Sequence, residues 1–306
     1  MHKLASACLL MAALLLSPSL LSAADPPLDY EGVTEKHVMI PMRDGVKLSA
    51  YLYIPNGKGP WPVLMEQRYA SLRSKGGRRS FAEMASHGYV VCGVNFRGSQ
   101  LSEGTWVGYR DLQWGEKRDG YDVVEWLAKQ PWSTGKIGTF GSSQAGYAQN
   151  YLAITQPPHL VCQFMIDTGL SLYDEGYFIG GAAKPNRFIG MAAVCRVPEH
   201  NMALMKEWFS HPDYDDYWRA EDASLHFDKM NVPCFTVGSW YDFMCVGSVQ
   251  SFIGRQHKGG PNSRGQQKLY IGPWLHGRFN KVNKVGEMEY PENANFDMMT
   301  EMIRWF

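Results

Sequence analysis

The feature that most constrains the fold of this chain is a series of short apolar runs that are continuous rather than alternating. Amphipathic segments with helical spacing separate several of these runs. A strand that is apolar on both sides has to be covered on both faces, as in a parallel sheet flanked by helices. The sequence therefore predicts an α/β fold with a doubly wound, mostly parallel sheet. The runs are residues 60–70, 89–98, 136–141, 160–169, 232–242 and 268–276.

Two segments depart from this pattern. Residues 33–55 alternate apolar and polar side chains around the turn Arg43-Asp44-Gly45, which predicts an opening β-hairpin. Residues 168–229 are rich in Gly, Tyr, Phe, Met and Trp. We interpret them as a helical insertion between two strands, at the carboxyl ends where sheets of this kind bind ligands. This insertion is expected to act as a cap.

The first 24 residues have the composition of a secretory signal peptide. A short basic start, "MHK", precedes the apolar run "LASACLLMAALLL" and a segment that ends in small residues. The run is shorter than the roughly 20 residues that span a bilayer, so cleavage is favoured over an uncleaved anchor. We expect residues 25–306 to form the mature domain, with a secreted or periplasmic location and no stable membrane span.

Charge and cysteine usage narrow the possible partners. Thirty basic residues balance 30 acidic ones without a basic stripe, which argues against nucleic acid. No cysteine spacing indicates a zinc site, and we expect no cofactor. Cys92, Cys162 and Cys234 lie in apolar runs and are predicted to be free thiols. A bridge between Cys195 and Cys245 stays open, as does a homo-oligomeric state.

The segment "FGSSQAG", residues 140–146, poses the question of which serine is a nucleophile. A nucleophile elbow is a sharp strand-to-helix turn that requires small residues on both sides of the serine. For Ser142, the residue two positions earlier is Phe140, which is too large. For Ser143 it is Gly141, and an alanine and a glycine follow. Ser143 is therefore the candidate, and the alternative is a serine that only caps the following helix.

The partners of such a serine are expected after later strands, an acid first and then a histidine. Asp242 ends one apolar run and His276 ends the next. His276 would be the general base, and Asp242 would orient its ring. Asp167, at the end of an earlier run, is the rival acid. The backbone N–H of Gln144, at the predicted helix start, would stabilise an oxyanion.

Several motifs resemble the family of α/β-hydrolases that contains cocaine esterase and X-prolyl dipeptidyl peptidase, together with α-amino acid ester hydrolases and glutaryl acylases. The resemblance extends from about residue 33 to the end and implies an α/β-hydrolase fold. It also implies the catalytic set Ser143, Asp242 and His276, with the hydroxyl of Tyr69 as a second oxyanion donor beside Gln144. The motifs, in order, are "MRDGVKLSAYLYIP", "NFRGSQLSEG", "RDGYDVVEWLAKQPWSTGKIGTFGSSQAG", "HPDYDDYW", "VGSWYD" and "GPWLHG".

The sequence departs from the family pattern in two places. Gln144 stands where family members usually carry a tyrosine, so the lining of the site is expected to differ. The family also continues into a C-terminal jelly-roll domain, for which this sequence has no counterpart, so we expect the chain to be either a fragment or a form that has lost that domain.

The expected function is a serine hydrolase that cleaves an ester or amide, including an amino acid ester or an X-Pro peptide, through an acyl-enzyme. The alternatives are an acyltransferase on the same triad and a catalytically inactive binding protein on the hydrolase fold. The partner is a small ester, amide or short peptide. Acidic residues in the insertion could hold a substrate ammonium group, although a solvated acidic helix start explains them as well. They are Asp213, Asp215, Asp216, Glu221 and Asp222.

Overall fold

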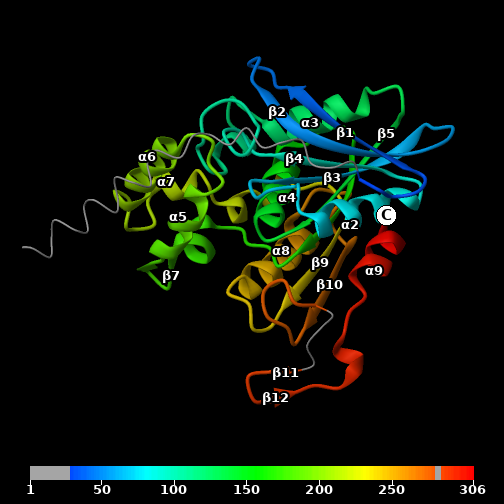
Figure 1. Cartoon of the computed structure of the whole chain (residues 1–306). Helices are drawn as coiled ribbons and strands as arrows, with labels where there is room; N and C mark the ends of the chain where they lie inside the picture. The colour runs from blue at the N-terminus through cyan, green and yellow to red at the C-terminus, as the bar shows by residue number, and fades with distance from the viewer. Residues whose placement is uncertain (1–27, 280–283) are drawn as a thin grey trace, which may run out of the picture.

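The computed structural model describes residues 28–279 and 284–306, and the predicted signal peptide lies outside them. Its centre is an eight-stranded sheet in the order β1-β2-β4-β3-β5-β6-β9-β10 (Figure 1). The two pairs β1·β2 and β2·β4 are antiparallel, and the remaining neighbours are parallel. This arrangement confirms the predicted fold class, and β1 and β2 form the predicted hairpin.

Six strands of the sheet coincide with the predicted apolar runs, and β1 and β2 lie in the alternating segment before them. The strands of the sheet are β1 (Val33–Pro41), β2 (Lys47–Pro55), β3 (Trp61–Arg68), β4 (Val90–Asn95), β5 (Ser133–Ser142), β6 (Leu160–Ile166), β9 (Cys234–Ser239) and β10 (Gln267–Gly272). Two short pairs lie outside the sheet, β7 (Phe178–Ile179) with β8 (Ala182–Ala183) and β11 (Lys284–Val285) with β12 (Met288–Glu289).

Helices cover both faces of the sheet. Apolar side chains of α2 (Lys75–Ser86) and α9 (Met298–Trp305) share one cluster with the aromatic side chains of β5, β6 and β9. Side chains of α3 (Asp119–Ala128) and α4 (Gln144–Thr155) pack on the other face. On that face α8 (Cys245–Lys258) is linked to α4 by a hydrogen bond of 2.8 Å from Arg255 to Asn150. The last residue, Phe306, contacts the ring of Phe164 at a centroid distance of 6.4 Å.

The chain between β6 and β9 forms a separate group of short helices, which Figure 1 shows to one side of the sheet. Its interior is aromatic: the ring of Tyr177 stacks on Trp208 at 4.1 Å, and Trp218 is buried beside them. The helical elements are η3 (Tyr173–Tyr177), α5 (Pro185–Ala192), α6 (Pro198–Phe209), α7 (Asp216–Arg219) and η4 (Ala223–Lys229). Elsewhere η2 (Arg110–Leu112) and η5 (Glu292–Ala294) are short 3₁₀ turns.

A buried arginine joins three of the motifs noted in the sequence. The guanidinium of Arg97 contacts Asp44 in the turn of the opening hairpin at 2.7 Å and Asp119 at the start of α3 at 2.7 Å. Asp111 adds a third carboxylate at 3.3 Å. Arg97 and Asp119 are almost completely buried, so each needs the other's charge. These motif residues therefore hold the scaffold together.

The structure settles the cysteine question for the residues it describes. All five cysteines outside the signal segment are free, so the bridge between Cys195 and Cys245 that the sequence left open is not formed. Cys92 and Cys234 are fully buried, whereas Cys162 is partly exposed. In the same described ranges, none of the helices has the length and apolar character needed to cross a bilayer.

Candidate active site

Ser143 lies on a strained turn between β5 and α4. Its φ of 58° and ψ of −111° place it outside the conformations that side chains normally allow. The space around it explains the small neighbours. A Cβ on Gly141 would lie 2.5 Å from the Cβ of Ala145, and one on Gly146 would lie 2.8 Å from the Cβ of Thr168. The backbone thus adopts the elbow geometry that the spacing predicted for Ser143.

The Ser143 side chain does not cap the helix. Its hydroxyl makes no capping hydrogen bond, although Ser143 is the residue that precedes α4. The first turn is closed by its backbone instead, because the carbonyl of Ser143 accepts from the N–H groups of Gly146 at 2.9 Å and Tyr147 at 3.1 Å. The alternative in which Ser143 serves only as a cap therefore lacks its defining contact.

The start of α4 offers a donor for a developing negative charge. Within the described chain, the backbone N–H of Gln144 has no hydrogen-bond partner. A free N–H at the first residue of a helix of this length carries part of the positive end of the helix dipole. An oxyanion next to Ser143 would be stabilised there.

His276 and Asp242 lie in direct contact. The Nδ1 atom of His276 is 2.9 Å from Oδ2 of Asp242. Because β5, β6, β9 and β10 are parallel neighbours, the segments that follow β5, β9 and β10 emerge at one edge of the sheet. Ser143, Asp242 and His276 belong to those three segments. The contact between Ser143 and His276 itself stays a prediction.

The rival acid, Asp167, lies at the same place but has a different contact. Its Oδ2 is 3.8 Å from Nδ1 of His276, farther than that of Asp242, and it accepts a hydrogen bond from the backbone N–H of Gly277 at 2.9 Å. Burial raises the pKa of Asp167, and the hydrogen bond from Gly277 opposes that rise. Asp167 thus holds the loop that carries His276. The three side chains also form a set of donors that could ligate a cation.

Tyr69 follows β3 and is held from two sides. Its ring packs edge-on against Phe96, Trp106 and Tyr109. Its backbone N–H donates to Oε1 of Gln144 at 2.8 Å, and the N–H of Ala70 donates to the same oxygen at 2.9 Å. Burial raises the pKa of the Tyr69 hydroxyl, which keeps it protonated as a donor at neutral pH. The sequence did not reveal the role of the Gln144 side chain, because its partners lie 75 and 74 positions away.

Most of the acidic residues of the insertion have structural roles. Asp215 caps α7 and contacts His211, while Asp216 pairs with Arg219 at 2.7 Å. Glu221 is buried and accepts from Arg110 at 2.7 Å, and Asp222 caps η4 and accepts from Tyr214. Four of the five candidates are thus engaged, which favours a structural explanation over an ammonium site.

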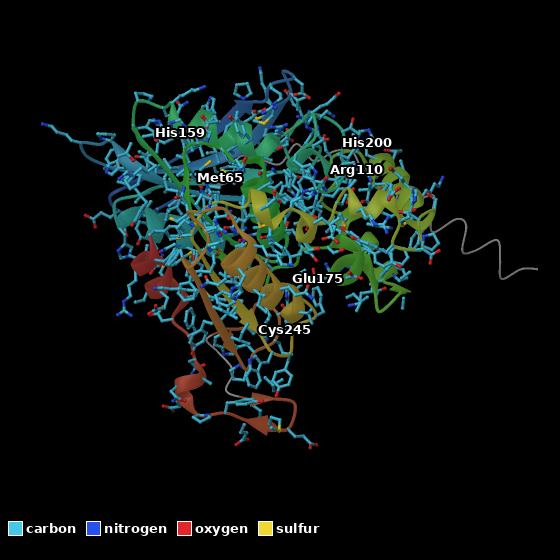
Figure 2. All side chains as sticks on the ribbon, turned by 180° about the vertical axis from the view of Figure 1, so that it is seen from behind. Met65, Arg110, His159, Glu175, His200 and Cys245 are labelled. Atoms are coloured by element: carbon cyan, nitrogen blue, oxygen red, sulfur yellow. The ribbon has the colours of Figure 1, made fainter. Side chains whose placement is uncertain are left out.

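The sequence reasoning also missed Glu175, a buried carboxylate where the insertion meets α8. Figure 2 labels Glu175 and Cys245, the first residue of α8, in this region. Oε2 of Glu175 accepts from the N–H groups of Leu170 at 2.6 Å and Ser171 at 3.1 Å. Burial raises the pKa of Glu175 to about 7 despite these bonds. Glu175 therefore orders the chain that leaves β6.

Comparisons with known proteins identify the family of the chain. The family model described as "X-Pro dipeptidyl-peptidase (S15 family)" matches residues 44–207 and 195–278. Cocaine esterase from Rhodococcus sp. (strain MB1 Bresler) is 25% identical, over 78% of this chain and 48% of its own.

Solved structures of other hydrolases are similar in fold to this chain. An α-amino acid ester hydrolase superposes with a TM-score of 0.73 and 20% identity, over 91% of this chain and 54% of its own. A CocE/NonD family hydrolase from Staphylococcus aureus has a TM-score of 0.70 and 26% identity, over 90% and 50%. The chain spans about half the length of these relatives. The match to the family model, together with the eight-stranded sheet, shows that the chain belongs to the X-Pro dipeptidyl-peptidase (S15) family.

Proposed function

We propose that the protein is a serine hydrolase that cleaves esters or amides through an acyl-enzyme formed on Ser143. One observation carries the proposal: a serine in a strained turn lies at the same sheet edge as a histidine already bonded to a carboxylate. The names of its relatives, an esterase and an ester hydrolase, favour ester cleavage. The composition of residues 1–24 favours action outside the cytoplasm.

In the proposed mechanism, His276 takes the proton of the Ser143 hydroxyl while the serine oxygen attacks the carbonyl carbon. Asp242 holds the ring so that Nδ1 carries the proton and Nε2 acts as the base. The N–H of Gln144 and the O–H of Tyr69 donate to the carbonyl oxygen as it becomes negative. His276 then protonates the leaving group. Finally, His276 takes a proton from a water molecule while the water oxygen attacks the acyl-enzyme, which releases the acyl group from Ser143.

The neighbouring serine provides a matched control. With 4-nitrophenyl acetate as the substrate, we expect Ser143→Ala to lower kcat by up to about a millionfold, as when other catalytic serines are removed. Ser142→Ala should leave kcat almost unchanged, because Ser142 ends β5. If Ser143→Ala retains normal hydrolysis, the mechanism is wrong. Faster consumption of the acyl group by added alcohols than by water would identify an acyltransferase instead.

A further inference from the structure

Two cations of the insertion lie over one aromatic ring beside His276. The Nζ atom of Lys184, just before α5, is 4.9 Å from the centre of the Phe243 ring. The guanidinium carbon of Arg187, in the first turn of α5, is 4.2 Å from the same centre. The Phe243 ring is in turn 5.0 Å from the imidazole of His276. Only the width of one aromatic side chain therefore separates this pair of cations from the histidine.

Neither cation has an anionic partner in the part of the chain that the structure describes. Two arginines at the insertion are paired, since Arg219 contacts Asp216 at 2.7 Å and Arg110 contacts Glu221 at 2.7 Å. By contrast, no carboxylate of the described residues forms an ion pair with Lys184 or Arg187, and their side chains make no hydrogen bonds there. A guanidinium with unused donors is well suited to bind a carboxylate in a bidentate manner.

The charge of Arg187 also reaches the side of the site that holds the oxyanion donor. Burial raises the pKa of each of four tyrosine hydroxyls, and the positive charge of Arg187 opposes that rise in every case. The four residues are Tyr69, Tyr109, Tyr147 and Tyr177.

We infer that Lys184 and Arg187 form a subsite for a carboxylate of the substrate, so that the enzyme prefers esters or amides with a free carboxylate close to the scissile bond. The inference rests on the proposed function, because it assigns the substrate class of the same site. A carboxylate would complete the bidentate hydrogen bonding of Arg187 and neutralise two positive charges that otherwise lie together. The alternative is that the two cations only fasten the insertion to Phe243 through cation–π contacts.

The test compares charged substrates with neutral ones of similar shape. The first pair is the mono-4-nitrophenyl ester of glutarate and its methyl ester, which differ in a carboxylate on the acyl side. The second pair consists of two pentanoate esters, one of 4-hydroxybenzoate and one of methyl 4-hydroxybenzoate. These two differ in a carboxylate on the leaving group. The variants are Arg187→Gln and Lys184→Gln. Lys206→Gln, an exposed lysine of α6, is the matched control.

We expect the wild-type protein to prefer the carboxylate in one of the two pairs, and the pair that shows the preference identifies which side of the substrate is bound. Arg187→Gln should lower kcat/KM for that charged substrate by about 10- to 100-fold, as expected for a lost charged hydrogen bond. The neutral partner should change little in this variant, and Lys206→Gln should change neither substrate. Equal losses for charged and neutral substrates, or no preference in either pair, would overturn the inference and leave the hydrolase proposal intact.

A binding measurement separates the two proposals. If no ester is hydrolysed, calorimetry with monomethyl glutarate tests the subsite without the reaction. Binding that Arg187→Gln weakens would support the subsite although the proposed hydrolase function fails. No binding by the wild-type protein would overturn the subsite as well.

Discussion

The side chain of Gln144 gives the sharpest prediction, because it connects the nucleophile turn to Tyr69. The oxygen of this side chain accepts hydrogen bonds from the backbone N–H groups of both Tyr69 and Ala70. Gln144→Met keeps the length of the side chain and the backbone N–H at this position. The substitution removes the amide group, and with it the oxygen that accepts both hydrogen bonds from the turn after β3. Gln144 would therefore act as a positioning residue, through the hydroxyl of Tyr69.

The structure bounds the size of the effect. Two hydrogen bonds between neutral groups stabilise the turn by about 2 kcal/mol in total, taking about 1 kcal/mol for each. Loss of one oxyanion donor costs about 3 kcal/mol, or roughly a hundredfold in kcat. Because the Tyr69 ring is also packed against three aromatic rings, the displacement is partial. We expect Gln144→Met to lower kcat by about 10- to 100-fold, with Tyr69→Phe as the limit.

A double-mutant cycle on 4-nitrophenyl acetate measures whether Gln144 works through Tyr69. If it does, the double variant Gln144→Met/Tyr69→Phe should be no slower than Tyr69→Phe alone. Thermal unfolding of each variant shows whether a loss of stability explains the rates. Losses that multiply in the double variant, or an unchanged kcat in Gln144→Met, would refute the reasoning.

Three further predictions concern buried charges. Arg97→Met leaves the Asp119 carboxylate buried without its partner and should lower the free energy of unfolding in urea by about 3–5 kcal/mol; a loss under about 1 kcal/mol would contradict this. Burial raises the pKa of Glu175 from its ordinary 4.5 to about 7. Between these values the unfolded chain loses the proton while the native state keeps it, so the free energy of unfolding should fall as pH rises. Glu175→Gln should remove up to about 3 kcal/mol of that pH dependence, and an unchanged slope would count against it. Asp242→Asn should lower kcat by about 10⁴-fold, as for an acid that orients the base, whereas Asp167→Asn, which bonds a backbone N–H, should cost much less. Equal losses would mean that the two carboxylates share the role.

The fold could be predicted because its signal is local. Each strand of the parallel part of the sheet appears as an apolar run, and two of the helices between the runs end just before Gly88 and Pro157, residues that stop a helix. The elbow at Ser143 was also accessible, since the required small residues lie within three positions of it. The order of acid and base followed from the chain order of triads on this fold, in which the acid precedes the histidine and both follow later strands.

The contacts that tune the site are not local, so the pattern could not show them. The partners of the Gln144 side chain lie on the turn after β3, and only the pairing of β3 with β5 brings the two segments together. Lys184 and Arg187 meet Phe243 because the insertion folds back toward the loop after β9. Nothing in the spacing of these residues indicates such a meeting. The sequence could not decide for the same reason whether Cys195 and Cys245 form a bridge, since cysteine spacing alone does not show which thiols lie together. In the structure both are free.

The most direct test of the central claim is to map where a fluorophosphonate probe attaches to the folded protein, by mass spectrometry of its peptides. A reactive serine needs a base and an oxyanion site at once, so the adduct reports on the whole arrangement. We expect the adduct on Ser143, and strongly slowed labelling in His276→Ala. An adduct on Ser142, or a folded protein that stays unlabelled, would contradict the account.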